Sequence, residues 1–198
     1  MIAGDKGMNI LTDTLPDFIT VEGKKYCVNT DFRIWLEFDK IMHLENIGVK
    51  DKIMMVARLC FDKERIKVYP ENINETMDGL LSFFLCGKSP QKDGSEEKAF
   101  SFQHDSELIY SAFLTQYGID LLSVPYMHWY VFSALFQGLE EQRRIMKIIN
   151  WRLLDTNSVE NKEKRKQFKK IKEFYALPDE KSKEEKEADI AEILTQAF

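Results

Sequence analysis

The stretch Ser123–Leu139, SVPYMHWYVFSALFQGL, is the segment on which the interpretation of the whole chain depends. It places one His, one Trp, two Tyr and two Phe within the length of a single helix. Ser123 is in a position to cap this helix, and Pro125 suits its first turn. At the helical period, apolar side chains fall on two sides, with Met127, Tyr130, Val131, Ala134 and Leu135 on one and Trp129, Phe132 and Phe136 on the other.

A helix that is apolar nearly all round leaves two alternatives open. Either it is central in the core, or its second face contacts a partner protein. The partner alternative makes Trp129, Tyr130, Phe132 and Phe136 the candidate partner-binding residues, which would line a groove that captures a helix. The core alternative places the same rings inside the monomer, where aromatic side chains bring a large buried area.

The rest of the 198-residue sequence predicts a mainly α fold, a helical bundle-like domain with a short N-terminal β-hairpin. The hairpin strands are expected at Phe18–Val21 and Tyr26–Val28, and Glu22 to Lys25 would form a short loop that contains a glycine. Apolar periodicity predicts about seven or eight helices. They are expected in the segments 32–42, 49–61, 77–86, 108–117, 123–139, 140–154, 160–173 and 178–192.

Local signals mark several boundaries of these elements. Asn29 or Thr30 is expected to cap the first helix, and Asn72 with Glu75 three residues later resembles a capping box. Residues 87–98, GKSPQKDGSEEK, combine Gly, Pro, Ser and charge, and they predict the clearest loop of the chain.

The chain is expected to have three parts. Residues 1–7 show no periodicity and are expected to be a leader or a disordered tail, and residues 8–155 predict the mainly helical core domain with the hairpin. Residues 156–198 predict a charged C-terminal helical pair. In that pair, residues 160–173 hold seven Lys or Arg against three Glu, a net +4, and residues 178–192 hold three Lys against seven acids, a net −4. These two helices are expected to be able to fold back on each other.

No catalytic, cofactor or metal motif accompanies the polar residues. The three histidines, His43, His104 and His128, lack a Ser-His or Cys-His signature, and neither HExxH nor a glycine-rich phosphate motif occurs. We therefore expect no enzyme activity, no cofactor and no bound metal ion.

Composition also limits the compartment and the partners. No apolar run approaches the roughly 18–20 residues of a bilayer span, and no signal peptide is evident, so no membrane association is expected. Cys27, Cys60 and Cys86 are widely spaced and odd in number, which predicts buried thiols in a reducing cytoplasm. The net charge of −5 argues against a surface built wholly for nucleic acid.

The basic segment 160–173 carries an alternative function, that of a nucleic-acid-binding regulatory protein. Its affinity for DNA or RNA would fall steeply with salt. Two features oppose this use. Phe168, Ile171, Phe174 and Tyr175 give the segment an apolar stripe that favours packing, and the neighbouring acidic segment would compete with nucleic acid.

Five stretches together carry a resemblance to a known family. They are MNILTDTLPDFITVEGKKYCVNTDFRIWLEFD, QHDSELIYSAFLTQYGIDL, MHWYVFSALFQGL, KEFYALP and ADIAEILTQAF. With them the chain resembles a family of small proteins encoded in siphophage tail modules, in phages and prophages of Gram-positive bacteria. The genes of that family lie beside the tail-assembly chaperone genes and before the tape-measure gene. The similarity spans Met8 to Phe198.

The resemblance implies a non-enzymatic phage tail assembly protein that acts in the cytoplasm of the bacterial host. Its expected partners are the tape-measure protein or the tail-assembly chaperone. A tape-measure protein is a very long helical chain, and a chaperone-like binder would cover its apolar stripes until tube subunits surround it. The family has no established catalytic residue, so the resemblance assigns none to this chain.

Overall fold

The computed structural model describes residues 8–44, 47–66, 68–88 and 99–178. The expected leader at residues 1–7, most of the expected loop at 87–98 and nearly all of the acidic segment at 178–192 lie outside the described residues. Within them the chain is mainly helical and opens with a two-stranded antiparallel hairpin, so the predicted fold class is confirmed.

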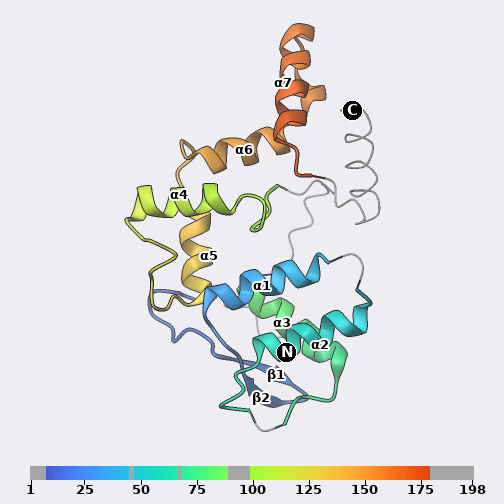
Figure 1. The fold of residues 1–198 in the computed structure, drawn as a ribbon, viewed down its shortest axis with the longest axis vertical. Helices are drawn as coiled ribbons and strands as arrows, with labels where there is room; N and C mark the ends of the chain where they lie inside the picture. The colour runs from blue at the N-terminus through green and yellow to red at the C-terminus, as the bar shows by residue number, and fades with distance from the viewer. Residues whose placement is uncertain (1–7, 45–46, 67, 89–98, 179–198) are drawn as a thin grey trace, which may run out of the picture.

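The described residues form seven α-helices, one 3₁₀-helix and one hairpin. They are β1 (Phe18–Val21), β2 (Lys24–Cys27), α1 (Phe32–Met42), α2 (Val49–Cys60), α3 (Ile73–Phe84), α4 (Ser106–Tyr117), α5 (Trp129–Gln137), α6 (Arg144–Leu153), the 3₁₀-helix η1 (Thr156–Ser158) and α7 (Lys162–Tyr175). Figure 1 shows α1, α2, α3 and the hairpin at one end of the molecule and α4, α6 and α7 at the other. Helix α5 lies between these two groups.

The hairpin turn is tighter than the sequence predicted. It has two residues, Glu22 and Gly23, with φ of 49° and 74°, and β1 and β2 are paired up to Val21 and Lys24. Positive φ at both central residues is the geometry of a type I′ turn, which matches the twist of the two strands. The expected four-residue loop is therefore wrong, because Lys24 and Lys25 belong to β2.

Helix α3 holds the hairpin in place. Asn72 caps the helix as predicted, since its Oδ1 accepts from the Glu75 amide at 3.1 Å. The Glu75 carboxylate, however, reaches the turn and accepts from the backbone N–H of Glu22 at 2.7 Å. Further along α3, Gly79 lets the helix approach the first strand closely, because a Cβ there would lie 3.1 Å from Ile19 Cδ1.

Two backbone hydrogen bonds join the starts of α1 and α5. The Phe32 amide donates to the Met127 carbonyl at 2.9 Å, and the Trp129 amide donates to the Thr30 carbonyl at 2.7 Å. Asp31, and neither Asn29 nor Thr30, is the N-cap of α1. His128 is extended to make this pairing and is itself the N-cap of α5, so the cap lies five residues later than the predicted Ser123.

Buried aromatic side chains from both ends of the molecule meet in one core. The largest side chains with almost no exposure include Trp35, Phe38, Phe61, Phe113 and Phe132. Trp35 stacks on Phe83 with ring centroids 4.5 Å apart.

The three cysteine thiols are free. Cys60 is fully buried, whereas Cys27 and Cys86 are only partly buried, so the expectation of buried thiols holds for Cys60 alone.

A buried ion pair joins α4 to α6. The two Arg152 Nη atoms donate to the two Asp105 carboxylate oxygens at 2.7 and 2.9 Å, and the side chains are only 9% and 4% exposed. Arg152 also donates to the carbonyls of Ala99 and Tyr175, and the Asp105 carboxylate accepts from the Ser101 amide. The guanidinium of α6 therefore bonds to the start of α4, to the segment before it at Ala99 and to the end of α7.

We expect the variant Arg152→Ala to lose about 3–5 kcal/mol of unfolding free energy, because it leaves the Asp105 carboxylate buried without its cation. Urea unfolding followed by circular dichroism measures this loss. The control is Arg144→Ala on the same helix, where the side chain is exposed and the expected change is within about 0.5 kcal/mol. Equal stability of the two variants would contradict the structural role of the pair.

Candidate functional site

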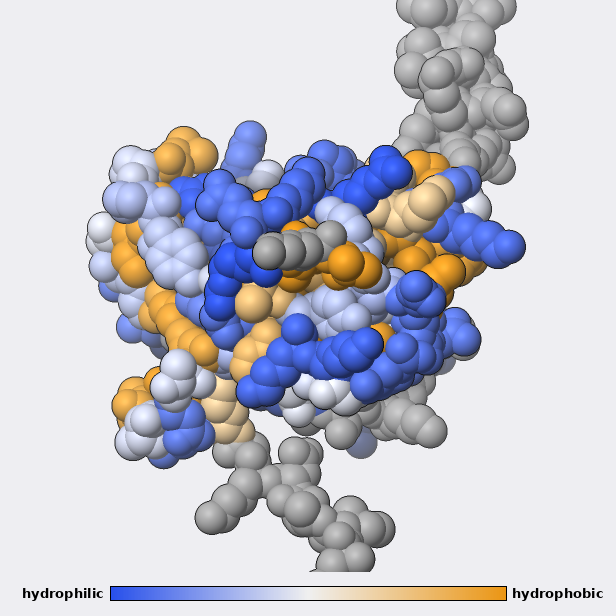
Figure 2. Space-filling model, turned by 90° about the horizontal axis from the view of Figure 1, so that it is seen from below, coloured by the Kyte–Doolittle hydropathy of each residue, from blue (hydrophilic) through white to orange (hydrophobic). Residues whose placement is uncertain are grey.

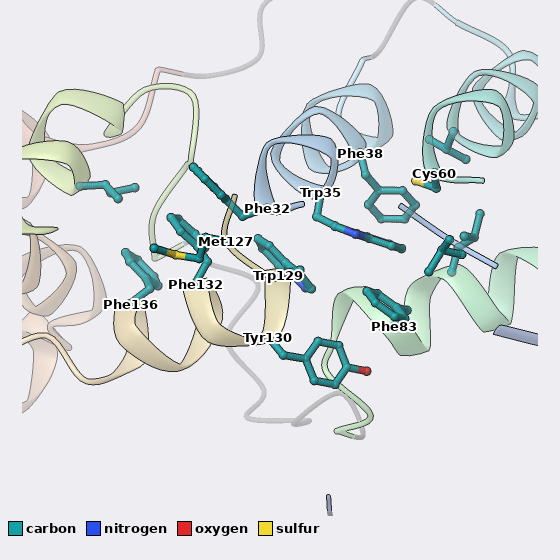
Figure 3. Close-up of a cluster of buried hydrophobic side chains, with 14 of the residues drawn as sticks. Phe32, Trp35, Phe38, Cys60, Phe83, Met127, Trp129, Tyr130, Phe132 and Phe136 are labelled. Atoms are coloured by element: carbon teal, nitrogen blue, oxygen red, sulfur yellow. The ribbon is translucent and has the colours of Figure 1, made fainter. Parts of the chain in front are cut away.

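The four candidate partner-binding residues of α5 lie in the core. Trp129, Tyr130, Phe132 and Phe136 are 2%, 7%, 1% and 8% exposed. Figure 3 shows Trp129 and Tyr130 on the side of α5 that faces Trp35 and Phe83. Phe132 lies beside Phe32, and Phe136 lies one turn further along α5, away from α1 and α3. They therefore form no exposed groove in this structure, and of the two alternatives that the sequence left open, the core alternative describes them.

The second apolar face of α5 is covered within the monomer. Phe132 lies between Phe32 of α1 and Phe113 of α4, with ring centroids at 4.8 and 5.0 Å. Trp129 stacks on Phe84 at 5.1 Å and donates from its indole nitrogen to the Phe84 carbonyl at 2.8 Å. The aromatic face of α5 is thus covered within the monomer, while the exposed residues of the helix are the small Ala134 and the polar Gln137.

His128 is the N-cap of α5, and both of its ring nitrogens are used. Nδ1 accepts from the Tyr130 amide at 3.0 Å, so the ring proton lies on Nε2, which donates to the Pro16 carbonyl at 3.0 Å. Burial lowers the pKa of His128, and this outweighs the opposing effects of the Pro16 bond and the charge of Asp17. The imidazole is thus a neutral structural group.

A polar cleft of about 310 Å³ brings the other two histidines together between α1 and residues 101–106. His43 Nδ1 lies 2.7 Å from the Asp39 carbonyl, and Ser101 Oγ accepts from the His104 amide at 3.3 Å. In the described part of the chain, no cluster of three His, Cys, Asp or Glu side chains could hold a metal ion. His43 Nδ1 also lies 3.5 Å from the Asp39 carboxylate, and the His104 bond is made by its backbone amide. Among the described residues, neither imidazole is hydrogen-bonded to a hydroxyl or a thiol.

A groove of about 450 Å³ between α2 and α3 is the more apolar hollow. Met54, Tyr69 and Ile73 are 53%, 43% and 51% exposed in it. A second hollow of about 450 Å³ adjoins it at Ile53. Figure 2 views the molecule from the end with α2, α3 and the hairpin, and hydrophobic side chains gather there between charged ones. We call the first hollow the α2–α3 groove; it is lined by Lys50, Ile53, Met54, Ala57, Arg58, Phe61, Tyr69, Pro70, Ile73 and Thr76.

Both charged residues of the α2–α3 groove are basic. Lys50 and Arg58 are exposed and lie eight residues apart on α2, about 12 Å along the helix axis. The floor between them is supplied by aliphatic, aromatic and Met side chains. Such a surface suits the apolar face of a helix whose edges carry acidic side chains.

The sequence did not predict this groove, because periodicity predicts a helix at residues 49–61 but not which of its apolar residues a neighbouring element covers. In the structure only Val56 and Cys60 of α2 are buried, while Ile53 and Ala57 are half-buried at the groove. The available signal was the excess of apolar residues, since Met54 and Met55 fall outside the buried face of α2.

Most of the basic segment 160–173 belongs to α7 (Lys162–Tyr175), which lies on the surface. None of its residues is buried. Phe168, Ile171 and Tyr175 are half-buried, and Tyr175 stacks on Trp151 of α6 at 4.9 Å. Phe174 is 79% exposed, so it does not belong to the packed stripe in which the sequence placed it.

Comparison with known protein families gives one match that covers most of the chain. Residues 11–177 match the family model of the Bacteriophage Gp15 protein. The chain belongs to the Bacteriophage Gp15 protein family. The matched range includes the hairpin and all seven described helices of this Gp15 family member. Comparisons with curated proteins and with solved structures gave no match.

Membership of the Gp15 family makes this a phage protein, which confirms the viral part of the expected role. The family match does not give the position of the gene or the partners of the protein, so both stay predictions. Within the described residues of this family member, no helix is long and apolar enough to cross a membrane.

The buried His128 predicts a pH dependence of stability. Because its folded-state pKa is lowered, the unfolded chain binds a proton more readily, and stability is lost as pH falls below the unfolded value of about 6.5. In urea unfolding between neutral pH and pH 5, the wild type should lose more stability than His128→Asn, which keeps a capping oxygen but does not titrate. His104→Asn, an exposed control, should keep the wild-type slope. Equal slopes for wild type and His128→Asn would contradict this assignment.

Proposed function

We propose that this Gp15 family member is a non-enzymatic phage tail assembly protein that holds a helical segment of the tape-measure protein in the α2–α3 groove. The proposal places the protein in the cytoplasm of the bacterial host, where tails are built. The observation that carries it is the exposed, largely apolar groove with basic residues at its edge. The family match and the resemblance to tail-module proteins support the phage setting.

The groove supplies both parts of a helix-binding surface. Met54 and Ile73 each leave about half of a large side chain exposed, and burying such area contributes on the order of 1–2 kcal/mol per residue. Met side chains adapt to partners of different shape, which suits a binder that meets many similar stripes on one long helical chain.

The basic residues define the register of the partner. Lys50 and Arg58 would each meet an acidic side chain beside the partner's apolar stripe. Because both lie on the exposed surface, their effect is expected mainly in the association rate and its dependence on salt.

The enzyme alternative rests on the polar cleft that contains His43 and His104. Among the described residues, neither imidazole is hydrogen-bonded to a hydroxyl or a thiol, and the same residues leave the apolar surface of the α2–α3 groove exposed. A binding function therefore accounts for more of the exposed surface than a catalytic one.

Co-expression with a helical fragment of the tape-measure protein tests the proposal. We expect the wild type to keep the fragment soluble and to co-purify with it. Met54→Glu and Ile73→Glu should each weaken binding about tenfold or more, because each places a charge on the apolar floor, and tenfold corresponds to about 1.4 kcal/mol. Both side chains are half-exposed, so folding should be kept, as thermal unfolding would show.

The matched control is Leu122→Glu, which alters a side chain that is 82% exposed and outside the groove. This variant should bind like the wild type. Failure of the wild type to bind or solubilise the fragment would refute the proposal, and so would equal binding by all three glutamate variants.

A further inference from the structure

The two walls of the α2–α3 groove differ in charge. The wall on α2 carries Lys50 and Arg58, whose side chains are exposed. Among the described residues, neither of these side chains makes a hydrogen bond or an ion pair. The wall formed by residues 69–76 is lined by uncharged residues, which are Tyr69, Pro70, Ile73 and Thr76. The groove therefore offers positive charge along one side only.

Lys50, Met54 and Arg58 form one ridge on the α2 wall. They are four residues apart, so their side chains follow one another on neighbouring turns of the helix. Met54 is 53% exposed and lies midway between the two cations, which are about 12 Å apart along the helix axis. A helix lying along the groove therefore meets a cation, an apolar side chain and a second cation in that order.

We propose that the helix held in the α2–α3 groove carries two acidic residues seven positions apart on one edge of its apolar stripe. This inference rests on the proposed function, because it specifies the partner of the same groove. Seven residues of a helix rise about 10.5 Å, and they return to the same side of the helix within about 20°. The flexible side chains of Lys50 and Arg58 absorb the remaining difference of about 1.5 Å.

Other arrangements of two acids fit the ridge less well. Acids four positions apart are separated by about 6 Å along the axis, so only one of them can lie opposite a cation. Acids eight positions apart match the rise but turn about 80° away from each other around the helix. An acid on the other edge of the stripe faces the wall of residues 69–76, which has no charged lining residue. Two acids on one edge, seven positions apart, therefore match both cations at once.

The length of the groove floor sets the length of the partner's stripe. From Lys50 to Phe61 the groove follows α2 for about 16 Å, or three turns of helix. A partner needs apolar residues at three- and four-residue spacing over this length. Exposed ion pairs are weak, so each matched acid changes the affinity by about two- to fivefold, and the apolar floor provides the rest. The acids thus select among apolar helices and do not create the binding.

Three designed peptides test the spacing against the full chain. Each is a helix of three heptads with the same apolar stripe, the same composition and two Glu residues. The first peptide has its Glu residues seven positions apart on one edge, the second has them four positions apart on that edge, and the third has one on each edge. At low salt we expect the first to bind wild type about three- to fivefold more tightly than the others. Fluorescence anisotropy of the labelled peptides measures the binding, and high salt should remove the difference by screening the exposed charges.

Substitution of the two cations should remove this preference. In the double variant Lys50→Gln and Arg58→Gln, the three peptides should bind with equal affinity, because the α2 wall no longer carries these charges. The matched control, Arg144→Gln with Lys147→Gln, removes one Arg and one Lys from exposed positions on α6 and should keep the preference. A version of the first peptide with a central proline should bind poorly, because the proline breaks the helix.

The outcomes separate this inference from the proposed function. Equal binding of the three peptides to wild type, with binding lost in Met54→Glu, would overturn the spacing and leave helix binding in the groove in place. A preference that persists in the double variant would overturn the role of Lys50 and Arg58, and tight binding of the proline peptide would overturn a helical occupant. If no peptide binds, the inference fails, and co-expression with the tape-measure fragment decides the proposed function by itself.

Discussion

The structure depends most on the pairing between the starts of α1 and α5. Two backbone hydrogen bonds, from Phe32 to Met127 and from Trp129 to Thr30, fix α5 against α1. His128, in the same bridge, caps α5 with one ring nitrogen and holds Pro16 with the other. Once α5 is fixed there, its aromatic rings on both faces are enclosed by helices from the two ends of the molecule.

That constraint explains why the rings of the most aromatic segment lie in the core and not on an exposed surface. Aromatic rings signal a large buried area, but the sequence does not say whether the monomer or a partner buries it. Here Phe113 from α4 and Phe32 from α1 cover Phe132, and both are far from it in sequence. The exposed apolar surface lies instead between α2 and α3, in segments that no sequence motif singled out.

Periodicity and local signals predicted the parts of the fold that are set by neighbouring residues. The range of α1, the Asn72 cap of α3 and the end of α4 at Tyr117 follow from such short-range preferences. The Asp105–Arg152 pair could not be predicted, because its residues are 47 positions apart and no local pattern links them. The α2–α3 groove was equally hidden, since it depends on how closely two helices pack.

The functional account then follows from exposure and charge. The family match makes this a phage protein. The α2–α3 groove offers an exposed apolar floor with basic residues at its edge, and the proposed binding of a helix rests on that surface.

Hydrogen–deuterium exchange of the protein with and without a tape-measure fragment tests the central claim most directly. The account predicts that the fragment slows exchange in α2 and α3, residues 49–60 and 73–84, and leaves exchange in α5, residues 129–137, unchanged. Slowed exchange confined to α5, with none in α2 or α3, would contradict it.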